Sequence, residues 1–410
     1  MKIRELTVKD FRGFGGERRF ALSERFTVIA GVNGRGKSSM LDGLALLAAR
    51  LLRALALSAG SGRTISAKDV HSGRAEAKLG MQANCAGIPV TFDVTYRPAT
   101  RKVRARGMPN AAVREQIRRH YGDPTREDDQ TPIAVYYTTD RAGYRLPRSL
   151  PTNLPASQRL AHHGALSNRM VDYRDFMARY RVWVTQQDTS PLTAFNRALG
   201  IFLEGFSELA VEEHPLRLTV QKAGARLSLQ QLSDGERAFI AVLGDLVRRL
   251  ALANPELANP LLGHGVVLID ELELHLHPRW QREVVEKLRT SFPNIQFIAT
   301  THSPFIIQSL RPGELITLDP DEFGEYANQS VEDIAEHVMG VKVPQKSERY
   351  LEMMHAAEEY YRLLREAPNQ AQAAEDRLAE LAMRFSDDPA YQALLRLERA
   401  ARQGADNAAR

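Results

Sequence analysis

The feature that most limits how this chain can fold is a glycine-rich loop close to its first residue. The stretch GVNGRGKSS, residues 31–39, matches the pattern G-x-x-x-x-G-K-[ST] at Gly31, Gly36, Lys37 and Ser38. A β-rich run precedes the loop, and leucines at helical spacing follow it. This context suits phosphate binding, because glycines let successive backbone N–H groups surround a phosphate and the next helix turns its positive end toward it. The sequence therefore predicts an α/β fold with a phosphate-binding loop between a strand and a helix.

The loop also supplies candidate ligands for a nucleotide and its metal ion. Lys37 is expected to reach the β- and γ-phosphates, and Ser38 is expected to bind Mg²⁺. The remaining loop residues expected to contact the nucleotide are Asn33, Gly34, Gly36 and Ser39. Together these residues would hold the phosphates of a nucleotide and one metal ion.

A second buried strand is predicted to bring acidic residues to this site. The apolar run GVVLIDE suits a strand covered on both faces, and it ends in Asp270 and Glu271. Asp270 is the predicted partner of Mg²⁺, and Glu271 can polarise the attacking water. His275 and His277 follow closely, so the whole stretch also resembles a zinc site. Because no third nitrogen or sulfur ligand is near, we interpret these histidines as structural loop residues, and Glu273 has no assigned role.

Two further segments carry polar residues at positions where a phosphate could lie. Ser233 and Glu236 have the spacing of a capping box ahead of an amphipathic helix, and a helix start with a nearby glycine, Gly235, can bind an anion. Residues 294–303 predict another buried strand, and His302 at its end should face the ligand edge of an open parallel sheet. A capped helix and a polar strand end are the ordinary alternatives for these two patterns.

Five motifs taken together resemble those of a known superfamily. GVNGRGKSS, LSDGE, VVLIDE, HLHPRWQ and TTHSP occur in the order and rough spacing of ABC-type ATPases of the RecF, SMC and OLD group. The closest resemblance is to PtuA-like ATPases of the Septu and retron anti-phage systems, over residues 1–45 and 227–345. It implies a P-loop ABC-ATPase head with a mixed sheet, ATP and Mg²⁺ as cofactors, and a homodimer or higher even oligomer with ATP at the interface.

The resemblance also implies roles for individual residues. Glu271 would be the catalytic base, His302 would contact the γ-phosphate, and Arg12 would approach the nucleotide phosphates. His275 and His277 would lie in the loop that crosses the dimer interface. The signature that completes the partner's site comprises Ser233, Asp234, Gly235 and Glu236, and it departs from the common LSGGQ. The candidates for the residue that links Mg²⁺ to the inserted lobe are Thr139, Asp140 and Arg141.

The remaining sequence predicts two additions to this core. Residues 46–226 are too many for one connection, so they should form an inserted lobe with antiparallel strands, a basic segment and helices. Residues 346–410 predict a C-terminal helical extension. The basic segment contains Arg101, Lys102, Arg104, Arg106, Arg114, Arg118 and Arg119. Such a segment can bind a phosphate backbone or form an ordinary solvated surface, so DNA is a candidate partner.

Composition and length limit where such a protein can work. The single cysteine, Cys85, cannot form an internal disulfide, which fits a reducing compartment. The first residues lack the apolar middle of a signal peptide, and no apolar stretch is long enough to span a bilayer. We therefore expect a cytoplasmic protein without a membrane partner. The net charge of +5 permits a nucleic-acid partner without requiring one.

These features lead to one leading hypothesis for function and three rivals. The chain is expected to be an ATP-dependent regulatory subunit that gates a separate effector in anti-phage defence. We expect no nuclease domain of the OLD (Toprim) type after Ser303, because the acidic residues Asp319, Asp321 and Glu322 are isolated. The expected effector is therefore a separate chain, such as an HNH nuclease, and a retron reverse transcriptase with its nucleic acid is a further candidate partner. The rivals are a RecF-like DNA-repair ATPase, a transporter ATPase and a self-sufficient metallonuclease.

Overall fold

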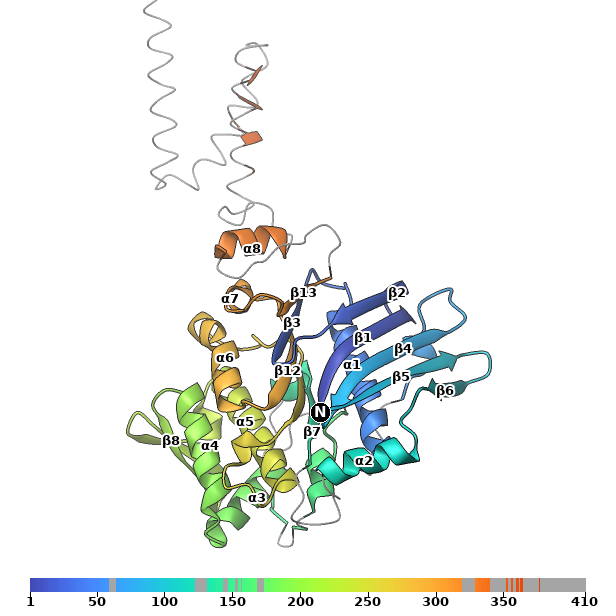
Figure 1. Cartoon of the computed structure of the whole chain (residues 1–410). Coiled ribbons are helices and arrows are strands. Elements are labelled where there is room, and N and C mark those ends of the chain that lie inside the picture. Colours follow the sequence, from blue (N-terminus) through green and yellow to red (C-terminus); the bar gives the residue numbers. More distant parts are fainter. Residues whose placement is uncertain are drawn as a thin grey trace, which may run out of the picture. The chain divides into compact units, whose positions relative to one another are not determined.

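The structure of the chain is a computed structural model (Figure 1). It describes residues 1–58, 64–121, 131–142, 147–151, 154–155, 157–167, 173–318 and 329–339, and single positions from 352 to 376. The chain divides into two compact units, Met1–Gly340 and Val341–Arg410. The predicted C-terminal extension, residues 346–410, lies almost entirely outside the described residues, as do Asp319, Asp321 and Glu322.

A parallel sheet forms the centre of the first unit. Its strand order is β13-β3-β12-β11-β7, and every neighbouring pair is parallel. The strands are β3 (Phe26–Ala30), β7 (Ile133–Tyr137), β11 (Gly265–Ile269), β12 (Ile295–Thr300) and β13 (Leu315–Thr317). All residues of β3, β7, β11 and β12 are buried, which is typical of parallel strands covered on both faces. Their carboxyl ends meet at one edge of the sheet, where the phosphate-binding loop begins.

A second, antiparallel sheet packs against helix α1 (Lys37–Ala54). Its strands, in the order β2-β1-β4-β5-β6, are β2 (Phe14–Ala21), β1 (Lys2–Phe11), β4 (Ala77–Cys85), β5 (Ile88–Arg97) and β6 (Lys102–Arg106). Helix α1 lies between the two sheets and shares one core with both, which explains why it is apolar on nearly all sides (Figure 1). Strands β4 to β6 come from the range predicted as an insertion, and they extend the sheet that β1 begins.

Helices and a small sheet cover the other face of the parallel sheet (Figure 1). These elements are α3 (Tyr173–Thr185), α4 (Thr189–Phe202), β8 (Phe206–Glu213), β9 (Leu216–Lys222), β10 (Ala225–Ser228), α5 (Asp234–Ala253) and α6 (Pro278–Ser291). One core cluster joins them to Val28, Val135 and Val267 of the parallel sheet. The other described α-helices are α2 (Ala111–Tyr121), α7 (Pro304–Gln308) and α8 (Val331–His337).

The predicted fold class is confirmed, since an α/β head carries the glycine-rich loop between β3 and α1. The parallel and antiparallel strands form separate sheets that share the helix between them. Within the parts of the chain that the structure describes, no helix is long and apolar enough to cross a membrane.

A buried ionic cluster fixes helix α5 against the end of β7. Asp245 accepts a hydrogen bond from the Tyr137 hydroxyl at 3.0 Å and pairs with Arg248 and Arg249, each at 2.6 Å. Arg249 also donates to the carbonyl oxygen of Ala161 at 2.6 Å. Burial alone would raise the pKa of Asp245, but the charges of Arg249 and Arg248 lower it from its ordinary 3.8 to about 2. The ion pairs lie within α5, and the hydrogen bonds to Tyr137 and to Ala161 join this charged cluster to the neighbouring elements.

Replacing Asp245 with asparagine should reduce the free energy of unfolding near neutral pH by about 3 kcal/mol, because two buried arginines would lose their counter-charge. The pKa of Asp245 is lower in the folded state than in the unfolded state. Its stabilisation is therefore present above about pH 4 and is lost as the pH falls toward 2. Urea unfolding over this range should show the difference between wild type and variant closing.

The matched control is Asp188→Asn, the same chemical change at an exposed position. Its free energy of unfolding should stay within about 0.5 kcal/mol of wild type at every pH. A difference between wild type and Asp245→Asn that did not depend on pH would contradict the ionic account of this cluster.

Candidate nucleotide-binding site

The phosphate-binding loop has a backbone that only glycine allows at one key position. Gly36 directly precedes α1 with a φ of 102°, a conformation that residues with a side chain rarely adopt. A Cβ atom at Gly36 would also lie 2.7 Å from the Phe14 ring. Asn33 and Gly34 are exposed on the loop, and Ser39 is half-buried in the first turn of the helix. The loop is therefore closely fitted on one side and open on the other.

Lys37 folds its side chain back over this loop. Its Nζ donates to the carbonyl oxygen of Gly31 at 2.6 Å and to that of Val32 at 3.1 Å, and the residue is only 7% exposed. The ammonium group therefore lies within the loop, where the oxygens of a bound phosphate could replace the two carbonyls as acceptors.

Ser38, Asp270 and Thr300 converge on one oxygen atom. Asp270 Oδ1 accepts the Ser38 hydroxyl at 3.1 Å and the Thr300 hydroxyl at 2.6 Å. The three residues come from the first turn of α1, the end of β11 and the end of β12, which lie side by side in the fold. A hydroxyl and a carboxylate are hard oxygen ligands, so the predicted pair of Ser38 and Asp270 suits Mg²⁺.

Glu271, directly after Asp270, has a strained backbone conformation that contacts with Thr300 and Arg141 stabilise. Its φ is 48°, and its backbone N–H donates to the Thr300 hydroxyl oxygen at 2.7 Å. The Arg141 guanidinium donates to the carbonyl oxygens of Asp270 and Glu271, and also to that of Thr138 at 3.1 Å. Burial lowers the pKa of Arg141 to about 10. Arg141, Thr139 and Asp140 share one short turn after β7, and Arg141 fixes the backbone beside both acidic residues.

We call residues 270–277 the acidic loop and residues 301–303 the switch loop. Glu273 of the acidic loop accepts a hydrogen bond from the Thr301 hydroxyl at 2.7 Å and another from the backbone N–H of His302. His277 is the N-cap of helix α6, where its Nδ1 accepts from the backbone N–H of Arg279 at 3.3 Å. Among the described residues, no group of three or more His, Cys, Asp or Glu side chains could hold a metal ion.

Sequence reasoning missed the role of Glu273, because its two donors lie 28 and 29 positions away.

The predicted capping box is present at the start of α5. The backbone N–H of Ser233 donates to Glu236 Oε2 at 2.9 Å, and the N–H of Glu236 donates to Ser233 Oγ at 3.4 Å. Glu236 also pairs with Lys222 of β9 at 2.7 Å, and Asp234 pairs with Arg237.

Gly235 brings the start of α5 onto the acidic loop. A Cβ atom at this position would lie 2.2 Å from the carbonyl oxygen of His275, far closer than any real contact. His275 itself has a φ of 64°. The candidate signature therefore contacts the loop that carries Glu271 within one chain.

Arg12 is held by two carboxylates. Its Nε donates to Asp69 at 2.9 Å, and its Nη1 pairs with Asp42. Asp42 lies one turn beyond Ser38 on α1. The pKa of the guanidinium is raised, since the two carboxylates outweigh the effect of burial. Arg12 thus braces the helix that follows the phosphate-binding loop, and its predicted contact with nucleotide phosphates remains a prediction.

The loop, the acidic strand end and the polar end of β12 are those of a P-loop ATPase domain. Comparison with protein families agrees with this class. A model described as "AAA domain, putative AbiEii toxin, Type IV TA system" matches residues 111–308, and a second model described as "AAA domain" matches residues 5–104.

The sequence relatives include retron probable ATPases and Septu proteins. Retron Ec83 probable ATPase of Escherichia coli is 50% identical over 113 residues, 28% of this chain and 21% of that protein. Retron Vc95 probable ATPase of Vibrio cholerae serotype O1 biovar El Tor is 47% identical over 110 residues, 27% of this chain and 21% of that protein. Septu protein PtuA of Bacillus thuringiensis is 31% identical over 146 residues, 32% of this chain and 37% of that protein. The predicted resemblance to PtuA-like ATPases of the Septu and retron systems is confirmed. The matches span about a fifth of the length of the two retron ATPases.

Solved structures with a similar arrangement include the SMC head domain from Thermotoga maritima. It is 16% identical, has a TM-score of 0.43, and is matched over 75% of this chain and 92% of that domain.

Replacing Gly235 with alanine should destabilise the chain by about 1–3 kcal/mol, because the added methyl group must push the acidic loop away from α5. The control is Gly200→Ala in α4, where an added Cβ meets nothing within 4 Å. That substitution should be neutral or slightly stabilising, since alanine suits a helix better than glycine. Thermal unfolding measures both, and a Gly235→Ala protein as stable as Gly200→Ala would refute the contact.

Proposed function

We propose that this chain is an ATP-binding and ATP-hydrolysing regulatory subunit that dimerises on ATP and gates a separate effector in anti-phage defence. One observation carries the proposal. Ser38 and Thr300 share a single carboxylate oxygen of Asp270 beside Lys37 and Glu271, so the residues proposed to bind phosphate, to bind metal and to activate water lie at one edge of the sheet. The names of the relatives, retron probable ATPase and Septu protein PtuA, support the assignment to defence.

Each residue of the site has a distinct part in this proposal. The loop N–H groups and Lys37 bind the phosphates. Ser38 and Asp270 would hold Mg²⁺, which neutralises phosphate charge when bound. Glu271 accepts a proton from the attacking water, and Arg141 keeps the backbone of Glu271 in place. His302, at the end of the neighbouring strand, senses the γ-phosphate.

The start of α5 would complete the site of a second subunit. A capped helix start carries partial positive charge and N–H groups that suit a phosphate. Ser233, Gly235 and Glu236 keep this start ordered through the capping box and the contact with His275. Dimerisation on ATP follows, because each nucleotide would then touch both subunits.

The effector is proposed to be a separate HNH nuclease, with a reverse transcriptase and its nucleic acid as further candidate partners. ATP-driven closure of two heads changes the surface that such a partner meets. Closure can therefore gate an activity that the head itself does not carry.

Two substitutions separate nucleotide binding from hydrolysis. Lys37→Ala should abolish ATP binding, because the loop loses its only lysine. Glu271→Gln should retain ATP binding but lower the hydrolysis rate by about 100-fold or more, because the amide cannot accept a proton. Fluorescent-nucleotide titration and phosphate release measure the two effects, and light scattering with ATP should show a dimer of Glu271→Gln.

The control is Lys287→Ala on α6, whose lysine pairs with Glu283 at 2.8 Å. It should bind and hydrolyse ATP like the wild type. If the wild-type protein neither bound nor hydrolysed ATP, the proposed function would be wrong.

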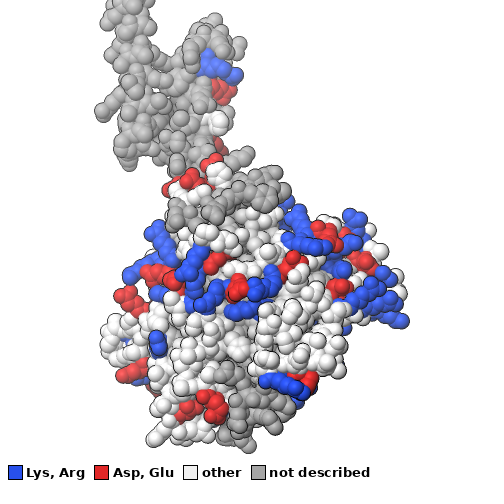
Figure 2. Space-filling model, in the orientation of Figure 1, with Lys and Arg blue, Asp and Glu red and all other residues white. Residues whose placement is uncertain are grey.

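A DNA-binding ATPase is the second candidate, and strand β6 favours it. Lys102, Arg104 and Arg106 are exposed on this edge strand while Val103 and Ala105 face inward. Figure 2 shows basic side chains gathered on this side of the antiparallel sheet, with acidic ones among them. An exposed row of cations at about 7 Å spacing suits a phosphate backbone.

Replacing Lys102 and Arg104 with alanine tests this candidate. If the protein binds DNA through β6, affinity should fall and the slope of log affinity against log salt should weaken by about two. The control is the double variant Arg197→Ala and Arg217→Ala, which removes two exposed charges from α4 and β9. Equal losses in both double variants would argue against a site on β6.

A further inference from the structure

Glu273 joins two loops that the proposed mechanism uses for different tasks. It lies in the acidic loop, between Glu271 and His275. Its two carboxylate oxygens accept one hydrogen bond each from the switch loop, from the Thr301 hydroxyl at 2.7 Å and from the His302 backbone N–H. Hydrogen bonds to a charged acceptor are stronger than neutral ones, so the two loops are tied firmly at this point.

Gln281 of helix α6 provides a second link between the same loops. Its Nε2 donates to the carbonyl oxygen of Leu276 at 2.8 Å, and its Oε1 accepts from the Ser303 hydroxyl at 2.6 Å. The acidic loop is therefore tied to the switch loop near its middle and near its end. Neither loop can shift far without moving the other or breaking these bonds.

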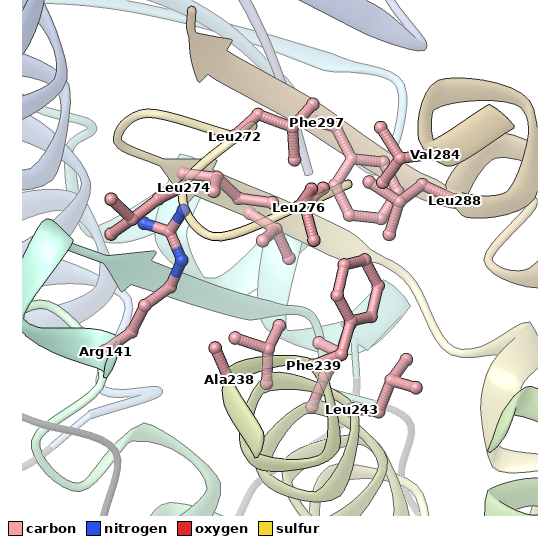
Figure 3. Close-up of a pocket in the computed structure, with 14 residues that line it drawn as sticks. Arg141, Ala238, Phe239, Leu243, Leu272, Leu274, Leu276, Val284, Leu288 and Phe297 are labelled. Carbon is pink, nitrogen blue, oxygen red and sulfur yellow. The ribbon is translucent and has the colours of Figure 1, made fainter. Parts of the chain in front are cut away.

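The opposite side of the acidic loop is packed less tightly. Leu272, Leu274 and Leu276 face Phe239 and Leu243 of α5 across an apolar cavity of about 30 Å³ (Figure 3). Side chains that line a void lose dispersion contacts on that side. The leucines therefore have room to repack when the loop moves.

We infer that Glu273 is a positioning residue that couples His302 to the acidic loop, and through the contact of His275 with Gly235 to the start of α5. The inference rests on the proposed function. A displacement of His302 by the γ-phosphate moves Glu273, the acidic loop and then the signature that faces the partner's nucleotide. Two links of this chain are contacts in the structure: the hydrogen bond from the His302 backbone to Glu273 and the close approach of His275 to Gly235. The two ATP sites of the dimer thereby communicate.

A double-mutant cycle with His302 tests this coupling. Glu273→Ala should lower kcat for ATP hydrolysis about 10- to 100-fold with KM changed less than about twofold, since misplacement of catalytic groups acts on the chemical step. The dependence of rate on ATP concentration should also lose its cooperativity. Glu273→Gln, whose amide oxygen can still accept from the His302 N–H, should retain more activity than Glu273→Ala.

The decisive comparison is made in the His302→Ala background. There, Glu273→Ala should add little to the loss already caused by His302→Ala, because both act on one coupled unit. Glu283→Ala is the control, since this half-buried residue of α6 pairs with Lys287 at 2.8 Å and contacts neither loop, and it should keep wild-type kinetics.

Three outcomes would overturn the inference. These are a wild-type kcat for Glu273→Ala, a full multiplicative loss in the double variant, or equal activity of Glu273→Gln and Glu273→Ala when both are folded. If Glu273→Ala fails to fold, the same cycle is run with Glu273→Gln, and a multiplicative loss there overturns it. Wild-type protein without ATPase activity would remove the proposed function and this inference together, whereas active wild type with independent effects removes the inference alone.

Discussion

The arrangement of the site depends on one oxygen atom, Oδ1 of Asp270, that receives hydroxyl groups from two different elements. Ser38 reaches it from the first turn of α1, and Thr300 reaches it from the end of β12. This is possible because β3, β12 and β11 are parallel neighbours whose carboxyl ends lie at one edge. Helix α1 lies between the two sheets, and its leucines pack against both of them. This packing fixes the phosphate-binding loop at the same edge. The polar centre is thus positioned by an apolar core that surrounds it.

The sequence predicts the parts of this site whose residues are close together in the chain. The loop of residues 31–39, the acidic pair at the end of β11 and the capping box at Ser233 are local patterns, and local backbone preferences decide them. Contacts between distant residues cannot be read in this way. Glu273 meets the switch loop 28 positions on, and Arg141 reaches carbonyls about 130 positions on, so only the folded chain shows what they do.

The pairing of strands within a sheet also depends on residues distant in the chain, so the sequence does not predict it. The segment of residues 78–98 has strand-like runs broken by turns, and it predicts a small antiparallel sheet. The structure pairs β4 with β1 over a long antiparallel register, so the sheet includes the first strand of the chain. Alternation of side chains indicates a strand with one buried face, but it does not say which strand lies beside it. Arg12 is similar, since its two carboxylate partners lie 30 and 57 positions away.

The acidic loop has a backbone conformation that costs free energy. Contacts with neighbouring residues determine whether the loop keeps this conformation. Glu271 and His275 both have positive φ, which disfavours residues with a side chain by roughly 1–2 kcal/mol each. Arg141 and Thr300 hold the first position, and the close contact with Gly235 holds the second. The apolar cavity under the leucines means that packing alone does not fix the loop. A loop that is strained, tied by polar contacts and loosely packed on one side can adopt a second arrangement when one of those contacts changes, and in the inferred coupling that contact is the bond between Glu273 and His302.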